Sequence, residues 1–329
     1  MRTGSAKAAQ TLARTLAQGR RWLLASHLNP DGDAIGAMVG LSLILEGLGQ
    51  ETVTHNGSGV PAPYRFLPGS ERVQSQAPEV LDFDGLIVLD SGELKRIGDL
   101  AERVQELPLL INLDHHVPKE PWGDVAWIEE EAPAVGTMVL ELAGLLKARI
   151  DPQAALNLYT AIMTDTGRFQ HGNTDAETLA AAAELARLGA DPALAAREVY
   201  QTYTEGRLKL LARALGTLEL HQGGLVALMT LRRDDFKETG TSLVDMDNFV
   251  DYARGVKGVE VAATLREEEG GYKISLRSTG KADVARLAAA FGGGGHRMAA
   301  GAFMEGGLDQ VRERLVKGVR DSLAGGRDG

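Results

Sequence analysis

The stretch that decides the fold of this chain is residues 27–34, with the sequence HLNPDGDA. An apolar run of strand length, residues 22–26, comes directly before it. After it, residues 34–48 have the apolar spacing of a helix, and Gly49 is a common helix stop. A strand, a polar turn and a helix form the repeating unit of an α/β fold, whose ligands usually bind at the carboxyl ends of the strands. The sequence therefore predicts a ligand-binding turn at residues 27–34.

Two carboxylates in this turn are candidate metal ligands. Pro30 and Gly32 bend the chain, so the side chains of Asp31 and Asp33 can point toward neighbouring positions. His27 offers an imidazole at the start of the same turn. An ordinary explanation is also open, because Asp33 could simply cap the helix that follows. Taken alone, the turn leaves both interpretations standing.

Three further segments place polar residues after apolar stretches. Asp90 follows residues 86–89, and the triplet DHH at 114–116 follows residues 109–113. Asp165 lies near the end of an expected helix. A lone Asp in such a place is usually a turn residue, so each segment has a simple explanation by itself. Parallel strands deliver their last residues to one edge of the sheet, however, so together the segments predict one cluster.

The cluster predicts a centre for two divalent metal ions. Its expected ligands are His27, Asp31, Asp33, Asp90, His115 and Asp165. Asp90 is expected to bridge the two ions. His27 and Asp31 would bind one ion, and Asp33, His115 and Asp165 would bind the other. Four aspartates balance two divalent cations, which leaves room for a phosphoryl oxygen and a hydroxide. Oxygen-rich ligation favours Mn²⁺ or Mg²⁺, and the chemistry predicted is phosphoester hydrolysis.

His116 and Asp114 have a different expected role. Consecutive residues of a strand point to opposite sides, so His115 and His116 cannot do the same job if the strand persists. One imidazole can bind metal while the other faces substrate. Asp114 can orient either ring as a hydrogen-bond acceptor. The catalytic candidates are therefore Asp90, Asp114 and His116.

The pattern of apolar runs predicts an α/β protein of two domains. A larger N-terminal domain with a mainly parallel sheet flanked by helices is expected at 1–190, a helical linker at 191–215, and a smaller α/β domain at 216–329. Strands are expected at 22–26, 51–54, 86–89, 109–113, 225–231, 259–266 and 272–277. Helices are expected at 6–18, 34–48, 134–146, 152–163, 176–188, 192–203, 204–220 and 283–291.

Composition and charge exclude several classes of protein. The chain has 329 residues, which fits two domains, and no cysteine, which excludes disulfides, thiolate metal sites and a cysteine nucleophile. A net charge of −10 argues against a protein that coats long nucleic acid. The first 19 residues lack the apolar core of a signal peptide, and no apolar run is long enough to span a membrane. A cytoplasmic protein without a membrane partner is expected.

A second polar cluster lies in the C-terminal part. Residues 292–295 are four successive glycines, and His296 and Arg297 follow them. The backbone amides of such a run can approach an anion closely. Between residues 271 and 301, five Lys or Arg residues stand against one Asp, a local excess in an acidic chain. The pattern predicts an anion-binding face, with a solvated charged surface as the alternative.

Together these motifs resemble the DHH phosphoesterase superfamily with its C-terminal DHH-associated domain, and within it the bifunctional oligoribonuclease and pAp-phosphatase group, or nano-RNases. The resemblance covers nearly the whole chain and rests on HxxPDGD at 27–33, Asp90, DHH at 114–116, TDTG at 164–167 and GGGGH at 292–296. It implies that the six ligands bind two Mn²⁺ ions and that His116 contacts a substrate phosphate. It also implies a nucleotide held by Arg277, Ser278, Gly293, Gly294, Gly295, His296 and Arg297.

The activity that the resemblance implies is hydrolysis of short oligoribonucleotides to mononucleotides and dephosphorylation of pAp to AMP. The expected cofactors are two divalent ions, Mn²⁺ first, with Mg²⁺ or Co²⁺ as alternatives. The expected partners are short RNA or DNA oligonucleotides and small nucleotides such as pAp and pApA, and a homodimer is left open. Alternative functions are a cyclic or linear di-AMP phosphodiesterase, a RecJ-like single-strand DNA exonuclease and, in another class, a nucleotide-binding regulator without turnover. The main substrate and the 5′ or 3′ polarity stay open.

Overall fold

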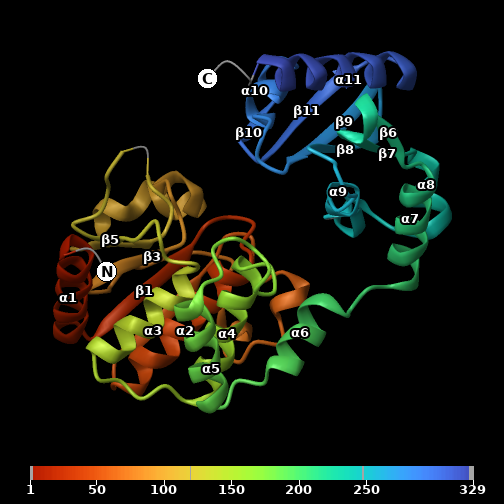
Figure 1. Cartoon of the computed structure of the whole chain (residues 1–329). Coiled ribbons are helices and arrows are strands. Elements are labelled where there is room, and N and C mark those ends of the chain that lie inside the picture. Colours follow the sequence, from red (N-terminus) through yellow and green to blue (C-terminus); the bar gives the residue numbers. More distant parts are fainter. Residues whose placement is uncertain (1–2, 119, 247, 326–329) are drawn as a thin grey trace. The chain divides into compact units, whose positions relative to one another are not determined.

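The computed structural model describes residues 3–118, 120–246 and 248–325. The chain divides into two compact units, Met1–Thr202 and Tyr203–Gly329 (Figure 1). The division falls within the expected linker at 191–215. Each unit has its own sheet and its own buried core.

The first unit contains a five-stranded parallel sheet with the order β2-β1-β3-β4-β5. Its strands are β1 (Arg21–Ser26), β2 (Glu51–His55), β3 (Gly85–Leu89), β4 (Leu110–Asp114) and β5 (Val125–Ile128). This arrangement confirms the predicted parallel α/β fold. The edge strand β5 was not predicted, because four residues are too few to show a strand pattern. The chain leaves β1 toward one edge and returns to β3 on the other side, so the strand order switches between β1 and β3.

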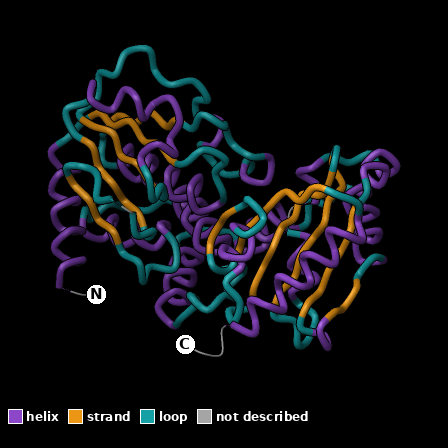
Figure 2. The backbone as a smooth tube through the Cα atoms, turned by 90° about the horizontal axis from the view of Figure 1, so that it is seen from above, coloured by secondary structure: helices purple, strands orange, loops and turns teal. Residues whose placement is uncertain are grey.

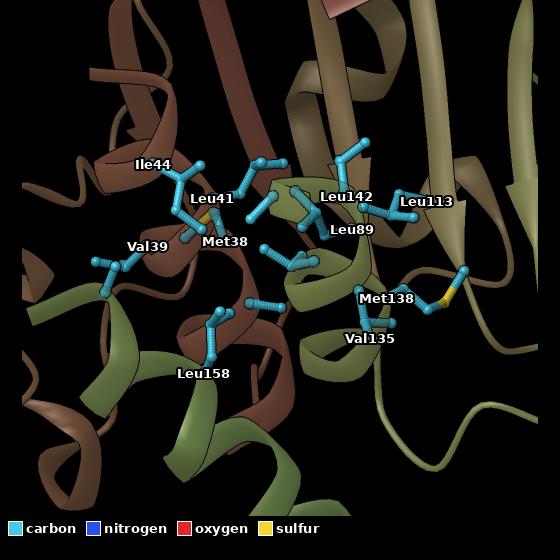
Figure 3. Close-up of a cluster of buried hydrophobic side chains, with 14 of the residues drawn as sticks. Met38, Val39, Leu41, Ile44, Leu89, Leu113, Val135, Met138, Leu142 and Leu158 are labelled. Carbon is cyan, nitrogen blue, oxygen red and sulfur yellow. The ribbon is translucent and has the colours of Figure 1, made fainter. Parts of the chain in front are cut away.

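Helices cover this sheet. They are α1 (Thr3–Gln18), α2 (Gly32–Gly47), α3 (Val135–Leu145), α4 (Pro152–Asp165), α5 (Ala176–Arg187) and α6 (Pro192–Tyr200), with 3₁₀ turns η1 (Ala62–Tyr64), η2 (Ser70–Arg72) and η3 (Leu94–Glu106). Buried side chains of α2, α3 and α4 pack together and against β3 and β4 (Figure 3). A second apolar cluster on the opposite face packs η3 against β1 and β3.

Helix α2 is buried over almost its whole length, because the sheet lies on one side of it and α4 on the other. The two helices approach closely at Gly36. A Cβ atom at Gly36 would lie 2.5 Å from the Asn157 carbonyl oxygen, well inside the van der Waals limit. Glycine is therefore required there for α2 to lie against α4.

The second unit contains a six-stranded mixed sheet with the order β10-β11-β9-β8-β7-β6. Its strands are β6 (Glu219–His221), β7 (Val226–Leu231), β8 (Val261–Glu268), β9 (Gly271–Ser278), β10 (Gly294–His296) and β11 (Ala299–Glu305). Only the β7–β8 pair is parallel among the described strands of this sheet. Strands β10 and β11 form a hairpin that the sequence did not predict, since the glycines of β10 have no strand preference of their own.

Helices lie on both faces of this second sheet (Figure 2). They are α7 (Glu205–Gly216), α8 (Arg233–Thr239), α9 (Phe249–Arg254), α10 (Val284–Ala289) and α11 (Leu308–Gly325), with η4 (Gln222–Gly224) and η5 (Leu243–Met246). Helices α10 and α11 pack on one face, and α7, α8 and α9 pack on the other face over β7 and β8. In the described part of the chain, no helix is both long enough and apolar enough to cross a membrane.

Candidate metal centre and nucleotide-binding face

Three neighbouring strands of the first sheet end at one level. Ser26 of β1 is paired with Leu89 of β3, and Leu89 is paired with Leu113 of β4. The next residue along each strand is therefore His27, Asp90 or Asp114. These residues lie at the carboxyl edge of the sheet, beside the switch in strand order, where ligands of open α/β sheets bind.

Asp90 lies at the centre of the cluster. Its backbone has a φ of +56°, a left-handed conformation that is uncommon outside glycine, and its side chain is 2% exposed. One carboxylate oxygen, Oδ2, lies 3.7 Å from His27 Nε2, and the other, Oδ1, lies 3.7 Å from His115 Nε2. Asp90 thus faces the two imidazoles with different oxygens, as a bridging ligand would.

One set of ligand atoms comes from His27, Asp31 and Asp90, which all lie within 4.8 Å of one another. The His27 Nδ1 atom is 2.8 Å from the Leu28 carbonyl oxygen, which can only accept, so Nδ1 carries the proton. The other ring nitrogen, Nε2, faces Asp90. Asp31 is the N-cap of α2 and accepts from the Ala34 amide at 3.0 Å through Oδ1. The alternative interpretation, in which Asp33 caps this helix, is therefore wrong.

The second set comes from Asp33, His115 and Asp165, again within 4.8 Å. Asp33 is 1% exposed and accepts from the amides of Val135 and Gly136, at 2.6 Å and 2.9 Å, at the start of α3. The positive end of that helix dipole favours an anionic side chain. These bonds hold the carboxylate in place and leave further lone pairs for a cation.

His115 and Asp165 complete this second set. The Nδ1 atom of His115 donates to the Ala132 carbonyl at 2.9 Å, and its Nε2 is buried without a hydrogen-bond partner. That Nε2 lies 3.8 Å from Asp165 Oδ2. A buried ring nitrogen without a hydrogen-bond partner, beside carboxylates, is a candidate metal ligand.

Helix α4 carries Asp165 to the cluster because glycine stands at position 32. A Cβ atom at Gly32 would lie 2.4 Å from Thr164 Oγ1. The start of α2 can therefore touch the end of α4 only without a side chain at this position. The close contact brings Asp165 beside Asp31 and Asp33, which flank Gly32 in the sequence.

His116 and His115 have different environments, as their adjacent positions suggested. Their rings meet edge to face, with centroids 4.5 Å apart. The Asp114 carboxylate accepts from the His116 amide at 2.8 Å and from its Nδ1 at 3.0 Å. The His116 side chain is 52% exposed, whereas Asp114 is fully buried. His116 is thus held by Asp114 with its other ring nitrogen free to meet a ligand.

The electrostatics of the cluster fit a cation. Burial, followed by the charges of Asp90, Asp165 and Asp31, raises the pKa of Asp33 well above its usual value. Burial is also the main reason that the pKa of Asp165 is raised to about 6. Carboxylates crowded in this way need protons or metal ions to offset their repulsion. Four carboxylates and two imidazoles form a donor set suited to divalent metal ions, and the cluster indicates divalent metal binding.

The imidazoles act in the opposite direction on Asp90 and His116. Burial of Asp90 is outweighed by the neighbouring His116 and His27 rings, so the pKa of Asp90 is lowered. Hydrogen bonding to Asp114, and then to Asp90, raises the pKa of His116 to about 10. His116 is consequently a cation at neutral pH and can both attract a phosphate and donate a proton.

In the second unit, the candidate nucleotide-binding residues lie at one end of the sheet. Arg277 of β9 is paired with Ala299 of β11, and Ala299 is paired with His296 of β10. Paired residues share a face of a sheet, so Arg277 and His296 lie on the same face, on either side of a small alanine. This is the face opposite α11, and His296 on it is exposed.

The remaining candidates of this unit differ in exposure. Arg297 is exposed, and its guanidinium donates to the Gly280 carbonyl at 3.4 Å. Ser278 is fully buried, and its hydroxyl accepts from the Gly280 amide at 3.0 Å, so its side chain is not placed beside that of Arg277.

The glycine run is partly strand rather than loop. A Cβ atom at Gly293 would lie 2.1 Å from the Gly301 carbonyl oxygen, and one at Gly295 would lie 2.6 Å from the Ala299 carbonyl oxygen. These two glycines allow the hairpin to close. Gly294 has open space around it and lies on the same face as His296, because residues two apart on a strand share a face.

Several groups that shape the cluster were not found from the sequence. They are backbone atoms: the Leu28 and Ala132 carbonyls and the Val135 and Gly136 amides. Every residue has such groups, so no residue type could have marked them. Which of them meets a ligand depends only on the folded chain.

Comparisons with known proteins agree with these observations. Residues 21–163 match the DHH family, N-terminal domain, and residues 223–325 match the DHHA1 domain. The bifunctional oligoribonuclease and PAP phosphatase NrnA of Thermus thermophilus is 35% identical over 301 residues, which are 91% of this chain and 89% of the relative. The Bacillus subtilis protein of the same name is 28% identical over 300 residues, 88% of this chain and 91% of the relative.

A solved structure has the same fold over both units. The exopolyphosphatase-related protein from Bacteroides fragilis superimposes with a TM-score of 0.90 at 27% identity, covering 98% of each chain. The two family matches thus occur in the expected order along the chain. The Thermus thermophilus relative is 35% identical over 91% of this chain. On this ground the chain belongs to the DHH family and carries a DHHA1 domain at its C-terminal end.

Proposed function

We propose that this protein hydrolyses short oligoribonucleotides to mononucleotides and dephosphorylates pAp to AMP. The observation that carries the proposal is the position of Asp90, whose two oxygens face the imidazoles of the two ligand sets. A shared carboxylate between two sets is the arrangement that two-metal phosphoesterases use. The relatives named as bifunctional oligoribonuclease and PAP phosphatase support the substrate class.

The proposed metal ligands are His27, Asp31 and Asp90 for one ion, and Asp33, Asp90, His115 and Asp165 for the other. Mn²⁺ is the first candidate, since five of the seven contacts would come from carboxylate oxygens and two from imidazoles, a donor set that suits it, and Mg²⁺ or Co²⁺ are the alternatives. When bound, two such ions stabilise charge on a phosphoryl group and lower the pKa of water that attacks it.

His116 is the proposed acid of the reaction. Asp114 holds the ring at Nδ1, so Nε2–H is the proton that can reach substrate. When water attacks phosphorus and the bond to the leaving nucleoside oxygen breaks, that oxygen needs a proton, and the Nε2–H of His116 can supply it. Its raised pKa keeps this proton in place at neutral pH.

The DHHA1 unit is the proposed holder of the nucleotide. Arg277, His296 and Arg297 offer positive charge or hydrogen-bond donors to a phosphate, and Gly294 lets a ligand approach the backbone. Gly293, Gly295 and Ser278 support this face by forming the hairpin and the turn behind it.

A substrate panel tests the proposal. The full chain is loaded with Mn²⁺ and assayed on pAp, cyclic di-AMP and pApA. It is also assayed on a length series of RNA that starts at the dinucleotide, and on DNA of the same lengths. We expect the fastest turnover on pAp and on the shortest RNA oligomers, with release of mononucleotides.

Other outcomes of this panel assign other functions. Preference for cyclic di-AMP or pApA would make the protein a di-AMP phosphodiesterase. Preference for long single-stranded DNA would make it a RecJ-like exonuclease. Tight binding without phosphate or mononucleotide release on any substrate would contradict an enzyme and indicate a regulator.

A further inference from the structure

The segment that follows β2 contacts the loop that carries His27. Asn56 is fully buried, and its side-chain amide nitrogen donates to the His27 carbonyl and to Ser26 Oγ, both at 2.9 Å. Its side-chain oxygen accepts from the Ser58 amide at 3.0 Å. Every polar atom of this buried side chain is used, and its NH₂ group donates to the last residue of β1 and to the first residue of the loop that follows it.

The peptide group between His27 and Leu28 is held at both of its ends. Asn56 binds the carbonyl end, and the Leu28 amide donates to the Arg96 carbonyl at 2.7 Å. A peptide group fixed at both ends cannot rotate without losing a hydrogen bond, which costs about 1 kcal/mol each, and more when a buried group is left unpaired.

The next peptide group, between Leu28 and Asn29, is held in the same way. Its carbonyl accepts from His27 Nδ1 at 2.8 Å, and its amide donates to Ser58 Oγ at 2.9 Å. The first of these bonds sets the tautomer of His27 and points its Nε2 at Asp90. The residues at 56–58 therefore fix the backbone that in turn fixes the His27 ring.

Apolar packing supports the same loop. The Leu28 side chain lies against Gly57 and Gly98, where an added Cβ atom would come within 3.0 Å and 3.1 Å of its methyl carbons. Gly98 belongs to η3 and has a φ of +74°. Neither the segment at 56–58 nor η3 contributes a candidate metal ligand, so their contacts with the loop have no direct role in holding an ion.

We propose that Asn56 is a positioning residue that sets the metal affinity of one half of the centre, the half formed by His27, Asp31 and Asp90. The inference rests on the proposed function only in so far as metal ions bind this cluster. The other half is held independently, because Asp33 is fixed by amides of α3 and His115 by the Ala132 carbonyl. Loss of Asn56 should weaken one ion and spare the other.

The test counts metal ions and measures each affinity. Mn²⁺ binding to the full chain is followed by calorimetry and by electron paramagnetic resonance, for the wild type and for Asn56→Ala. We expect two ions in the wild type. The variant should keep one ion with unchanged affinity and bind the other roughly 10- to 100-fold more weakly, the usual effect of losing a partner that orients a metal ligand. Raising Mn²⁺ should restore kcat on pAp.

Two further variants separate positioning from folding. Ser58→Ala removes only the bond to the Asn29 amide from an exposed side chain, so it should fold and weaken the same ion less strongly. Asn157→Ala is the matched control. Asn157 is also a fully buried asparagine of the first unit, and its amide donates to the carbonyls of Pro68 and Gln153. That variant should melt at a lower temperature and keep both ions.

The outcomes distinguish this inference from the proposed function. If the wild type binds two ions and both Asn56→Ala and Ser58→Ala keep both affinities, the inference is overturned and the proposed function is untouched. A folded Asn56→Ala protein that weakens both ions equally would also overturn it, because Asn56 would then have a general structural role. A wild type that binds no Mn²⁺ would overturn the metal assignment and this inference with it.

Discussion

At the scale of single residues, Asp90 is the position on which the proposed chemistry depends most. Its left-handed backbone has a cost for a residue with a side chain, of about 1 kcal/mol or more. The conformation turns the chain sharply at the end of β3 and aims the carboxylate between His27 and His115. Strain of this kind is commonly found where a side chain must be aimed at a functional site.

Substitution of Asp90 by alanine should abolish activity on every substrate, because it removes a ligand from both halves of the centre. We expect a loss of kcat on the order of 10³-fold or more, beyond that of removing one electrostatic contact. Mn²⁺ stoichiometry and pAp turnover measure this loss.

Asp84→Ala is the matched control, since Asp84 comes just before β3 as Asp90 comes just after it. Asp84 accepts from the Arg20 and Arg21 amides, so its loss should lower stability and leave kcat unchanged. Substantial turnover by Asp90→Ala would contradict the bridging role.

Arg277 should matter for the nucleotide rather than for the chemistry. Arg277→Ala should raise KM for dinucleotides roughly 10-fold or more, the effect of losing one charged hydrogen bond, with little change on bis-p-nitrophenyl phosphate. Lys273→Ala is its control, because Lys273 is a cation on the same strand and face, four residues away. That control should leave both KM values unchanged. An equal loss on both substrates after Arg277→Ala would mean that Arg277 acts on the reaction itself or on folding.

At the scale of elements, the contact between α2 and α4 decides whether Asp165 reaches the cluster. Gly32 meets Thr164 at one end of the contact, and Gly36 meets the Asn157 carbonyl one turn further along α2. Helices α2 and α4 thus approach each other closely along the side of α2 that carries Gly32 and Gly36. The candidate metal centre depends on this packing although neither glycine has a side chain that could bind metal.

Gly32→Ala should separate the two helices at the site. The added carbon would lie 2.4 Å from Thr164 Oγ1, so the structure must shift, at a cost of about 1–3 kcal/mol, and Asp165 should move away from Asp31 and Asp33. Thermal melting and Mn²⁺ affinity measure both effects. Gly47→Ala, in the same helix with nothing within 4 Å, should instead stabilise by about 0.4–1 kcal/mol. Unchanged Mn²⁺ affinity in Gly32→Ala would show that the contact does not set the site.

At the scale of the whole molecule, the chain has two units with separate cores, and the candidate metal ligands all belong to the first. Metal binding should therefore stabilise that unit directly. A ligand that binds only the folded state at about 100 times its Kd adds about 2.7 kcal/mol of stability. The crowded carboxylates of the cluster add to this effect, since a cation relieves their repulsion.

Hydrogen exchange with and without Mn²⁺ should show this division. We expect Mn²⁺ to slow exchange in peptides that cover residues 27–40, 86–92, 110–116 and 160–170, and a chelator to reverse the change. Peptides that cover β8, β9 and β11 should exchange at the same rate in both conditions. Equal protection of both sheets would contradict a metal centre confined to the first unit.

The types of the chemical groups and their places along the chain could be predicted from the sequence alone. Asp90 and the DHH triplet follow apolar strands, and the ends of parallel strands meet at one edge, so local patterns were enough to expect a cluster there. The same patterns predicted the parallel sheet and the second domain. They failed for β5, which is short, and for β10, whose glycines pair with β11 only in the folded sheet. They also failed at residues 219–220, which were expected in a helix and lie in β6, where they pair with β7.

Only the tertiary structure decided how these groups face one another. In the folded chain, the two oxygens of Asp90 face two different imidazoles, and Asp33 accepts hydrogen bonds from amides of α3. Ser278 is buried, and Asn56 donates a hydrogen bond to the His27 carbonyl. Each of these contacts joins segments far apart in the chain through a hydrogen bond or a close approach. Such contacts depend on the packing of whole elements, and a local pattern of residue types holds no information about that packing.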